Sequence, residues 1–153
     1  MYVNLSPGYF NGLLSSLMIK NNHQNRFVRM SYVQSFRDLE VYKQARELSN
    51  RIFTISTGFP KEEKYALTDQ IRRSSRSVGA QIAEAWAKRR YEKHFISKLT
   101  DADGEQQETQ HWLETAHDCG YLTEAEAKQL VTEYQLLGRK LGAMMNKADK
   151  FCR

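Results

Sequence analysis

Proline, cysteine and long apolar runs are scarce in this chain of 153 residues. With only two prolines and eight glycines, it has few of the residues that separate short strands, which disfavours a sandwich or barrel built from hairpins. The two cysteines, Cys119 and Cys152, lack the spacing of a zinc site and encode no disulfide framework. A reduced, cytoplasmic setting is therefore expected.

The N-terminal part is expected to contain neither a membrane span nor an export signal. Its most apolar run, residues 13–19, is too short to cross a membrane and has no basic flank of the kind that signal peptides carry. Residues 1–34 are rich in Asn, Ser and Gly without a sustained period, which predicts a flexible N-terminal extension. Translation from Met30 would leave residues 1–29 outside the folded unit. The folded domain is predicted to span residues 35–153.

Four amphipathic helices are predicted in that domain, because apolar residues recur three and four positions apart. The expected helices run from Ser35 to a stop at Gly58 and Pro60, over 62–89, over 91–118, and from Thr123 through Ala148. Short connections between long helices place neighbouring helices antiparallel. We therefore predict an all-α protein with the fold of an antiparallel up-down-up-down four-helix bundle.

The helix ends carry start and stop residues. Thr123 and Glu126 are spaced as a capping box, in which a hydroxyl and a carboxylate each accept from a free backbone amide. Ser35 and Asp38 are spaced in the same way. Gly120 is placed to close the third helix.

Charge is unevenly distributed along the chain. Residues 71–98 contain eight basic and two acidic residues, whereas residues 99–133 contain one basic and nine acidic residues. One interpretation is a polyanion-binding face, and another is contact between opposite charges on neighbouring subunits. A third is that the blocks are solvated helix faces that differ in sign.

The basic block supplies the candidate nucleic-acid contacts, which lie on the second helix and in the turn after it. These residues are Arg72, Arg73, Arg76, Lys88, Arg89, Arg90 and Lys93. The helical period places Arg72 and Arg76 on the outward side. Among aromatic residues only Tyr91 is interleaved with the basic ones, so contact with phosphates and little base preference are expected.

The end of the second helix, residues 78–87, is apolar almost all round. Its small residues on the side away from the inner stripe would let another subunit approach closely, and they are Gly79, Ala80, Ala83 and Ala87. A homo-oligomer interface is one interpretation. The other is that small residues are there because alanine favours helix formation.

Residue patterns that indicate an enzyme are lacking. Glu108 with His111 and Glu114 with His117 have a metal-binding spacing, but they lie six residues apart on one helix and face different directions. The serines at 74–77 have no accompanying Ser-His-Asp order, and no phosphate-cradling glycine loop is present. We predict no catalytic residue, no metal site and no cofactor. A metalloenzyme, the alternative, would contain bound iron or manganese.

Short motifs spread over residues 36–151 resemble the small bacterial four-helix proteins first noticed as products of intervening sequences within 23S rRNA genes. The matching motifs are Phe36-Arg37-Asp38-Leu39, Val41-Tyr42, Phe59-Pro60, Gln70-Ile71-Arg72-Arg73-Ser74, Ile82-Ala83-Glu84 and Gly120-Tyr121-Leu122. Three positions depart from the usual pattern. The family commonly has Asn at the position of Gln81, Gly at the position of Ala85, and Ser at the position of Glu105.

The resemblance implies a compact bundle that assembles as a homo-oligomeric ring, often a pentamer, with a basic surface for RNA or DNA and no enzymatic activity. Accessory proteins of diversity-generating retroelements, which work with a reverse transcriptase and its template RNA, are similar in fold only. We therefore predict a non-enzymatic homo-oligomer that binds nucleic acid, RNA in the first place, through its phosphates. The alternative is a protein-protein adaptor or scaffold, such as a retroelement accessory protein, with an acidic helix that docks on a basic block.

Overall fold

The computed structural model describes residues 33–152, so the predicted extension falls almost wholly outside the described residues and stays a prediction. Four α-helices make up most of the described part: α2 (Glu40–Ser56), α3 (Leu67–Ala87), α4 (Glu92–Asp118) and α5 (Glu124–Met145). Three short 3₁₀ helices lie between or beside them: η1 (Phe36–Asp38), η2 (Lys61–Tyr65) and η3 (Ala148–Lys150). Residues 33–152 contain no strand, and the predicted all-α class is confirmed.

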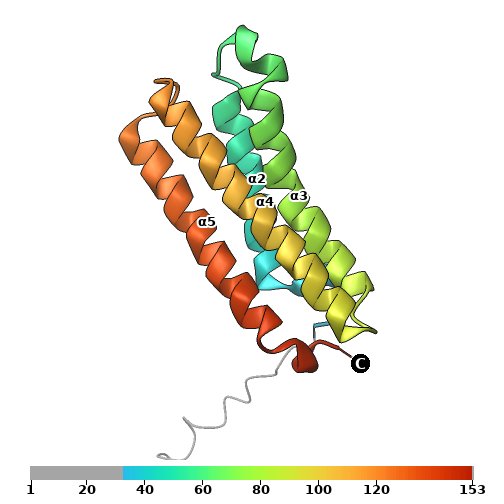
Figure 1. Ribbon diagram of the computed structural model, residues 1–153. Coiled ribbons are helices and arrows are strands. Elements are labelled where there is room, and N and C mark those ends of the chain that lie inside the picture. Colours follow the sequence, from blue (N-terminus) through green and yellow to red (C-terminus); the bar gives the residue numbers. More distant parts are fainter. Residues whose placement is uncertain (1–32, 153) are drawn as a thin grey trace, which may run out of the picture. The chain divides into compact units, whose positions relative to one another are not determined.

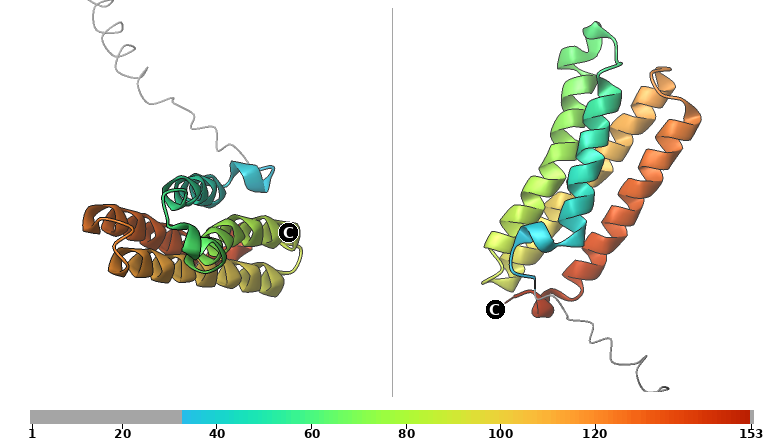
Figure 2. Two further views of the ribbon diagram at one scale, coloured as in Figure 1. Left: turned by 90° about the horizontal axis from the view of Figure 1, so that it is seen from above. Right: turned by 180° about the vertical axis from the view of Figure 1, so that it is seen from behind.

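Successive helices run in opposite directions. In the view of Figure 1, whose colours follow the sequence, the chain runs upward in α2, downward in α3, upward in α4 and downward in α5. Figure 2 shows the same arrangement from the end and from behind, with the α2–α3 connection at one end and the α3–α4 connection at the other. This is the up-down order that short connections impose on long neighbouring helices. None of the helices in the described part combines the length and apolarity that a membrane span requires.

The core is built from the apolar seams that the sequence pattern predicts. Each helix buries residues three and four positions apart, such as Leu48 and Ile52 of α2, Val78 and Ile82 of α3, Phe95 and Leu99 of α4, and Leu137 and Leu141 of α5. Each of these side chains is at most 1% exposed. Full burial of such a side chain stabilises the fold by about 1.5–3 kcal/mol, so the four seams fix the bundle.

The second predicted helix begins later than expected. Residues 61–65 form the separate turn η2. The helical conformation is then interrupted at Ala66, before α3 starts at Leu67. The carboxylate of Glu63 accepts a hydrogen bond from the backbone N–H of Leu67 at 3.2 Å and another from the Tyr121 hydroxyl at 3.1 Å. The prediction of one helix over 62–89 was therefore wrong at its start, because Glu63 caps α3 from the preceding turn.

Gly120 closes α4 as predicted. It adopts a φ of 76°, in the left-handed region that glycine enters without a side-chain clash. Its N–H donates to the His117 carbonyl at 2.8 Å, and the N–H of Tyr121 donates to the Ala116 carbonyl at 2.9 Å. This pair of bonds is a Schellman motif, which satisfies the last carbonyls of the helix.

The predicted capping box at Thr123 is present, and the predicted N-cap arrangement at Ser35 is also a capping box. The Thr123 hydroxyl accepts from the N–H of Glu126, and the Glu126 carboxylate accepts from the N–H of Thr123, at the start of α5. Ser35 and Asp38 form the same reciprocal pair, but they begin the short turn η1 and not a long helix. The helix α2 follows from Glu40.

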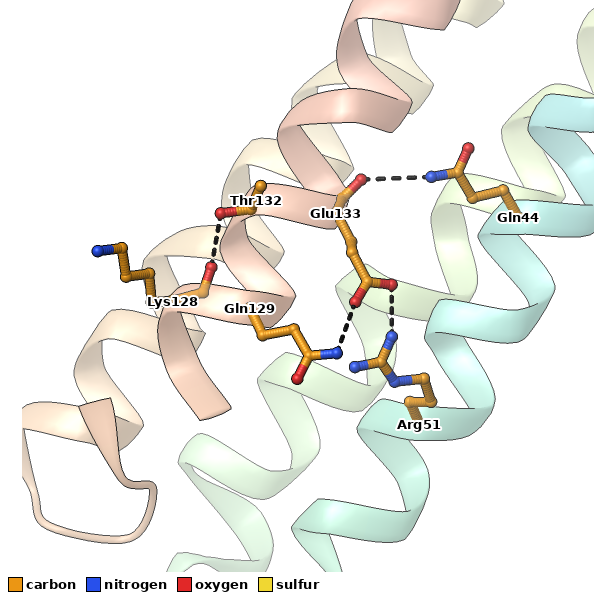
Figure 3. Close-up of polar contacts among 6 residues, drawn as sticks. All are labelled: Gln44, Arg51, Lys128, Gln129, Thr132 and Glu133. Atoms are coloured by element: carbon orange, nitrogen blue, oxygen red, sulfur yellow. Dashed lines mark hydrogen bonds and ion pairs between the residues drawn. The ribbon is translucent and has the colours of Figure 1, made fainter. Parts of the chain in front are cut away.

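Polar side chains join the first and last of the four helices (Figure 3). Arg51 of α2 forms an ion pair with Glu133 of α5, and the hydrogen bond from Arg51 lowers the pKa of the Glu133 carboxyl. Gln129 also donates to this carboxylate, at 3.2 Å, while Gln44 donates to the Glu133 carbonyl at 3.4 Å. These contacts tie α2 to α5 at the bundle surface.

Candidate nucleic-acid interface

The seven predicted basic residues fall into two groups at opposite ends of α3. Arg72, Arg73 and Arg76 lie in the first half of α3, and the other four lie at the turn into α4. Arg76 and Lys88 are twelve residues apart, which corresponds to about 18 Å along a helix axis. The structure therefore does not bring all seven residues into one continuous patch.

The first group is organised around an exposed aromatic ring. Phe53 of α2 is 47% exposed, and the guanidinium carbons of Arg72 and Arg76 lie 4.8 Å and 5.9 Å from its ring centroid. We call Phe53, Arg72 and Arg76 the Phe53 cluster. Neither arginine forms an ion pair with a carboxylate within residues 33–152. An exposed ring beside arginines can stack a base while the arginines contact phosphates.

Arg72 is held in place within this cluster. Its Nε donates to the Ser56 hydroxyl at 2.7 Å, and its guanidinium also lies over Phe53. The hydroxyl of Ser56 in turn donates to the Phe53 carbonyl at 3.0 Å. A guanidinium fixed through Nε keeps its two terminal nitrogens for another acceptor, at a reduced entropic cost of ordering.

Arg73 does not belong to the Phe53 cluster. Successive residues on a helix point about 100° apart, so Arg73 is turned away from Arg72. Its charge acts on Glu105 of α4 instead: burial and the neighbouring Glu108 raise the pKa of Glu105, and Arg73 opposes that rise. Arg73 therefore lies between the basic and acidic faces of the bundle.

A groove lies between α2 and α3, and Arg76 of the Phe53 cluster is one of the residues that line it. Its volume is about 420 Å³, and its lining includes Arg46, Asn50 and Arg76. Small residues of α3 line the same groove, namely Gly79, Ala80 and Ala83. At 100° per residue these three lie on the same side of α3 as Arg72 and Arg76, so one helix face carries both the arginines and the small residues.

The four small residues predicted to contact another subunit differ in exposure. Gly79 is buried, and a Cβ there would lie 3.8 Å from the ring of Tyr42 of α2. Ala83 is half-buried, while Ala80 and Ala87 are exposed. The chain therefore covers Gly79 itself, and the contact of these residues with another subunit stays a prediction.

The second group, Lys88, Arg89, Arg90 and Lys93, is called the turn cluster. Lys88 forms an ion pair with Glu84 at 2.6 Å, and this hydrogen bond, with a smaller contribution from Lys98, lowers the pKa of Glu84. Arg89 donates to the Trp86 carbonyl at 2.7 Å and lies 4.1 Å from the Trp86 ring centroid. Two of the four cations are therefore engaged within the chain, while Arg90 and Lys93 are exposed.

The face of α4 beside α3 is acidic. A groove of about 450 Å³ is lined by Gln81, Thr100, Asp101, Gly104, Glu105 and Glu108. An added Cβ at Gly104 would meet nothing within 4 Å, so packing among the described residues does not require glycine there. This groove is opposite in sign to the groove between α2 and α3.

The residues with metal-binding spacing have local partners. The Glu108 carboxylate accepts from the Trp112 indole N–H at 3.0 Å, and His117 Nδ1 lies 3.2 Å from the Leu122 carbonyl. Within residues 33–152 no three His, Cys, Asp or Glu side chains are grouped so as to hold a metal ion. Ser74 is buried and lies 2.9 Å from the Thr109 hydroxyl, a contact that joins α3 to α4.

Comparison with known proteins assigns the fold to a family. The model of the 23S rRNA-intervening sequence protein family matches residues 37–143. The chain belongs to this family. A solved structure of a protein of unknown function from the S23 ribosomal protein family of Bacteroides thetaiotaomicron is similar, with 28% identity and a TM-score of 0.63. The match covers 69% of this chain and 95% of that chain. No curated protein matches this chain.

Membership of the 23S rRNA-intervening sequence family confirms the resemblance carried by the sequence motifs. The position of Gln81, where the family commonly has Asn, has a visible role in this member. The Gln81 side-chain oxygen accepts from Lys98 at 3.3 Å, which links α3 to α4. Lys98 also pairs with Glu84 and Asp101, so its charge is balanced on that face.

Sequence reasoning missed Phe53 and Arg46 as candidate site residues. A signal for Phe53 was present, because it is an aromatic residue one position after the buried Ile52 and therefore off the apolar seam of α2. Its position beside two arginines of α3 depends on how α2 packs against α3. The expectation that only Tyr91 accompanies the basic residues is therefore corrected, since Phe53, Trp86 and Tyr91 all lie beside arginines.

Proposed function

We propose that this protein is a non-enzymatic, homo-oligomeric helical bundle that binds RNA through its phosphates. The observation that carries the proposal is the exposed Phe53 ring near Arg72 and Arg76, neither of which has a carboxylate partner in the described part. Arginine matches phosphate with a planar set of donors, and the ring offers a stacking surface that any base can use. The Phe53 cluster is the main contact.

The turn cluster has a smaller role in this proposal. Lys88 and Arg89 already have partners in the chain, which leaves Arg90 and Lys93 to add phosphate contacts. Assembly of several copies, with Ala80, Ala83 and Ala87 at the contact, would repeat both clusters around a ring. Repeated sites on one RNA raise the overall affinity through effective concentration, without any new contact.

A salt titration tests the phosphate contact. Affinity for a single-stranded RNA is measured over a range of salt for the natural protein, for R72Q/R73Q/R76Q, and for a control triple variant, K128Q/R139Q/K150Q, which removes three exposed cations elsewhere. The slope of log affinity against log salt falls by about 0.7 for each phosphate that the protein no longer neutralises. We expect a fall for the arginine variant and little change for the control. An RNA affinity that does not change with salt, or that is unchanged in the arginine variant, contradicts the proposal.

A protein-protein adaptor is the second candidate function. The acidic α4 groove with Gly104 and Glu105 favours it, because this groove is opposite in sign to the arginine-bearing α2–α3 groove and glycine there has no role in intrachain packing. The partner would be a neighbouring copy or an unrelated protein, such as a reverse transcriptase. Sedimentation separates the candidates. An oligomer that dissociates at raised salt and does not bind polynucleotides supports the adaptor. An oligomer that stays assembled at raised salt and binds polynucleotides supports RNA binding.

A further inference from the structure

The groove between α2 and α3 continues the Phe53 cluster along both of its helices. On α2, Asn50 and Ser49 lie three and four positions before Phe53, and Arg46 lies four and three positions before them. Residues with this spacing are neighbours on one helix face. All three line the groove, and on the α3 side Arg76 belongs both to the groove and to the cluster. The exposed ring therefore lies beside one end of the groove.

The charged side chains that line the groove are two arginines on opposite walls, Arg46 of α2 and Arg76 of α3. Both are exposed, and neither forms an ion pair with a carboxylate within residues 33–152. None of the described residues that line the groove is acidic. The positive charge of the two arginines is therefore not neutralised inside the groove.

The acidic residue next to Arg46 on α2 is turned to the other side of that helix. Successive residues point about 100° apart, which turns Glu47 away from Arg46 and toward α5. There the hydrogen bond with Glu133 raises the pKa of Arg51, and the charge of Glu47 adds to this rise. The helix α2 therefore presents an arginine to the groove and a carboxylate to α5.

The other surfaces next to the Phe53 cluster carry carboxylates. At the α2–α3 connection, Glu62 and Asp69 are exposed and lie within a few residues of the lysines there. On the α4 side, Glu105 and Glu108 line the acidic groove. Of these three directions, only the α2–α3 groove has cations without carboxylates among its described lining. A polyanion that extends beyond the Phe53 cluster is therefore attracted into this groove.

The groove has the size and the polar groups of a nucleotide site. Its volume is about 420 Å³, within the range of roughly 300–1,000 Å³ for clefts that hold small ligands. Ser49 adds a hydroxyl and Asn50 adds an amide to the lining beside the two arginines. Both groups donate and accept hydrogen bonds, as a ribose or a base edge requires.

We infer that the α2–α3 groove is a second nucleotide site for single-stranded RNA, an inference that rests on the proposed function. The nucleotide next to the base stacked on Phe53 enters the groove, and its phosphate lies between Arg46 and Arg76. The strand is single because a protein ring stacks on bases that are free of a duplex. The far end of the groove, lined by Ala80 and Ala83, is left to the subunit contact. Arg46 thus becomes a phosphate contact outside the basic block of the sequence.

A pair of arginine variants tests the phosphate contact. R46Q removes a cation that belongs to the groove and not to the Phe53 cluster, and R139Q, at an exposed arginine of α5, is the matched control. We expect R46Q to lower the affinity for a single-stranded RNA by about tenfold. The slope of log affinity against log salt should fall by about 0.7, the share of one phosphate. R139Q should change neither value appreciably.

A pair of serine variants tests the groove without a change in charge. S49L places a larger side chain in the groove, and S97L makes the same change at an exposed serine of α4. We expect S49L to lower RNA affinity as R46Q does and S97L to leave it unchanged. Thermal denaturation of the variants verifies that they are folded. R46Q alone decides the question if S49L does not fold.

Sedimentation of the same variants distinguishes RNA from a second copy of the chain as the occupant. We expect R46Q and S49L to keep the oligomeric size of the natural protein. Dissociation of the oligomer by R46Q would assign the groove to the subunit contact and overturn the inference. Full RNA affinity in R46Q, with a natural protein that binds RNA, would overturn the inference and leave the proposed function in place. A natural protein that binds no RNA would overturn both.

Discussion

The two ends of α3 carry similar numbers of basic residues, but they differ in how many of these cations are already paired within the chain. In the Phe53 cluster, Arg72 and Arg76 lie on an exposed ring and have no carboxylate partner in the described part. In the turn cluster, Lys88 is paired with Glu84 at 2.6 Å, and Arg89 is bonded to the Trp86 carbonyl. Counts of basic residues along the chain do not distinguish these two ends.

For the RNA binding that we propose, we expect the availability of a cation, and not its presence in the sequence, to decide where the RNA binds. A lysine already paired with a carboxylate must give up that pair before it contacts a phosphate, whereas an arginine on an aromatic ring keeps free donors. We therefore assign the main RNA contact to the Phe53 cluster. Variants matched in type at the two ends of α3 test this assignment.

The largest expected effect comes from removing two cations at each end. R72Q/R76Q should lower RNA affinity by about thirtyfold or more at moderate salt, because each arginine loses charge-assisted bonds to phosphate. R90Q/K93Q removes the same charge and should lower it by about threefold. Fluorescence anisotropy with a labelled RNA measures both. Equal losses would remove the distinction between the clusters, and a larger loss at the turn would reverse it.

The aromatic residues give the next largest effect. F53A should lower RNA affinity by about tenfold, within the range for loss of one base stacked on a ring, while Y91A should change it by about twofold. F53L keeps an apolar side chain but removes the ring face, so it should behave as F53A does if stacking is the cause. Full affinity in F53L would show that the ring contributes only apolar contact.

The two ends should also differ in what their arginines contribute to stability. R72Q removes the hydrogen bond to Ser56 and the contact with Phe53, which should lower the free energy of unfolding by about 1 kcal/mol. R90Q removes a side chain that makes no hydrogen bond within residues 33–152 and lies 5.9 Å from the Tyr91 ring centroid, so it should lower stability by less than R72Q does. Chemical denaturation measures both values. Identical unfolding midpoints would mean that Arg72 is not held as the contacts indicate.

The smallest expected effect is an increase in RNA affinity. E84Q removes the carboxylate that pairs with Lys88 and Lys98. Because Lys98 keeps its ion pair with Asp101, only Lys88 becomes available, and RNA affinity should rise by about twofold. The matched variant E47Q, at an exposed carboxylate of α2, is the control. Unchanged affinity in E84Q would show that pairing does not limit the turn cluster.

Much of the fold was predictable from sequence because it depends on local pattern. The seams that contain Ile52, Leu99 and Leu137, and the stop at Gly120, follow from helical period and from glycine geometry. The break at Ala66 was not predicted, since it depends on a contact between Glu63 and Tyr121, which are far apart in sequence.

The site was predictable only in part, for the same reason. The outward position of Arg72 and Arg76 follows from the period of one helix. The pairing of Lys88 with Glu84 also has a sequence signal, because residues four apart on a helix are neighbours. The place of Phe53 beside the two arginines depends on the packing of α2 against α3, which no local pattern specifies.

Ultraviolet cross-linking of the natural protein to a single-stranded RNA, followed by mass spectrometry of the peptides, tests the central claim most directly. It reports which aromatic residue touches a base without any substitution in the protein. We predict that the main nucleotide adduct lies on the α2 peptide that contains Phe53. Adducts confined to peptides that contain Trp86 or Tyr91 would contradict the assignment of the RNA contact to the Phe53 cluster.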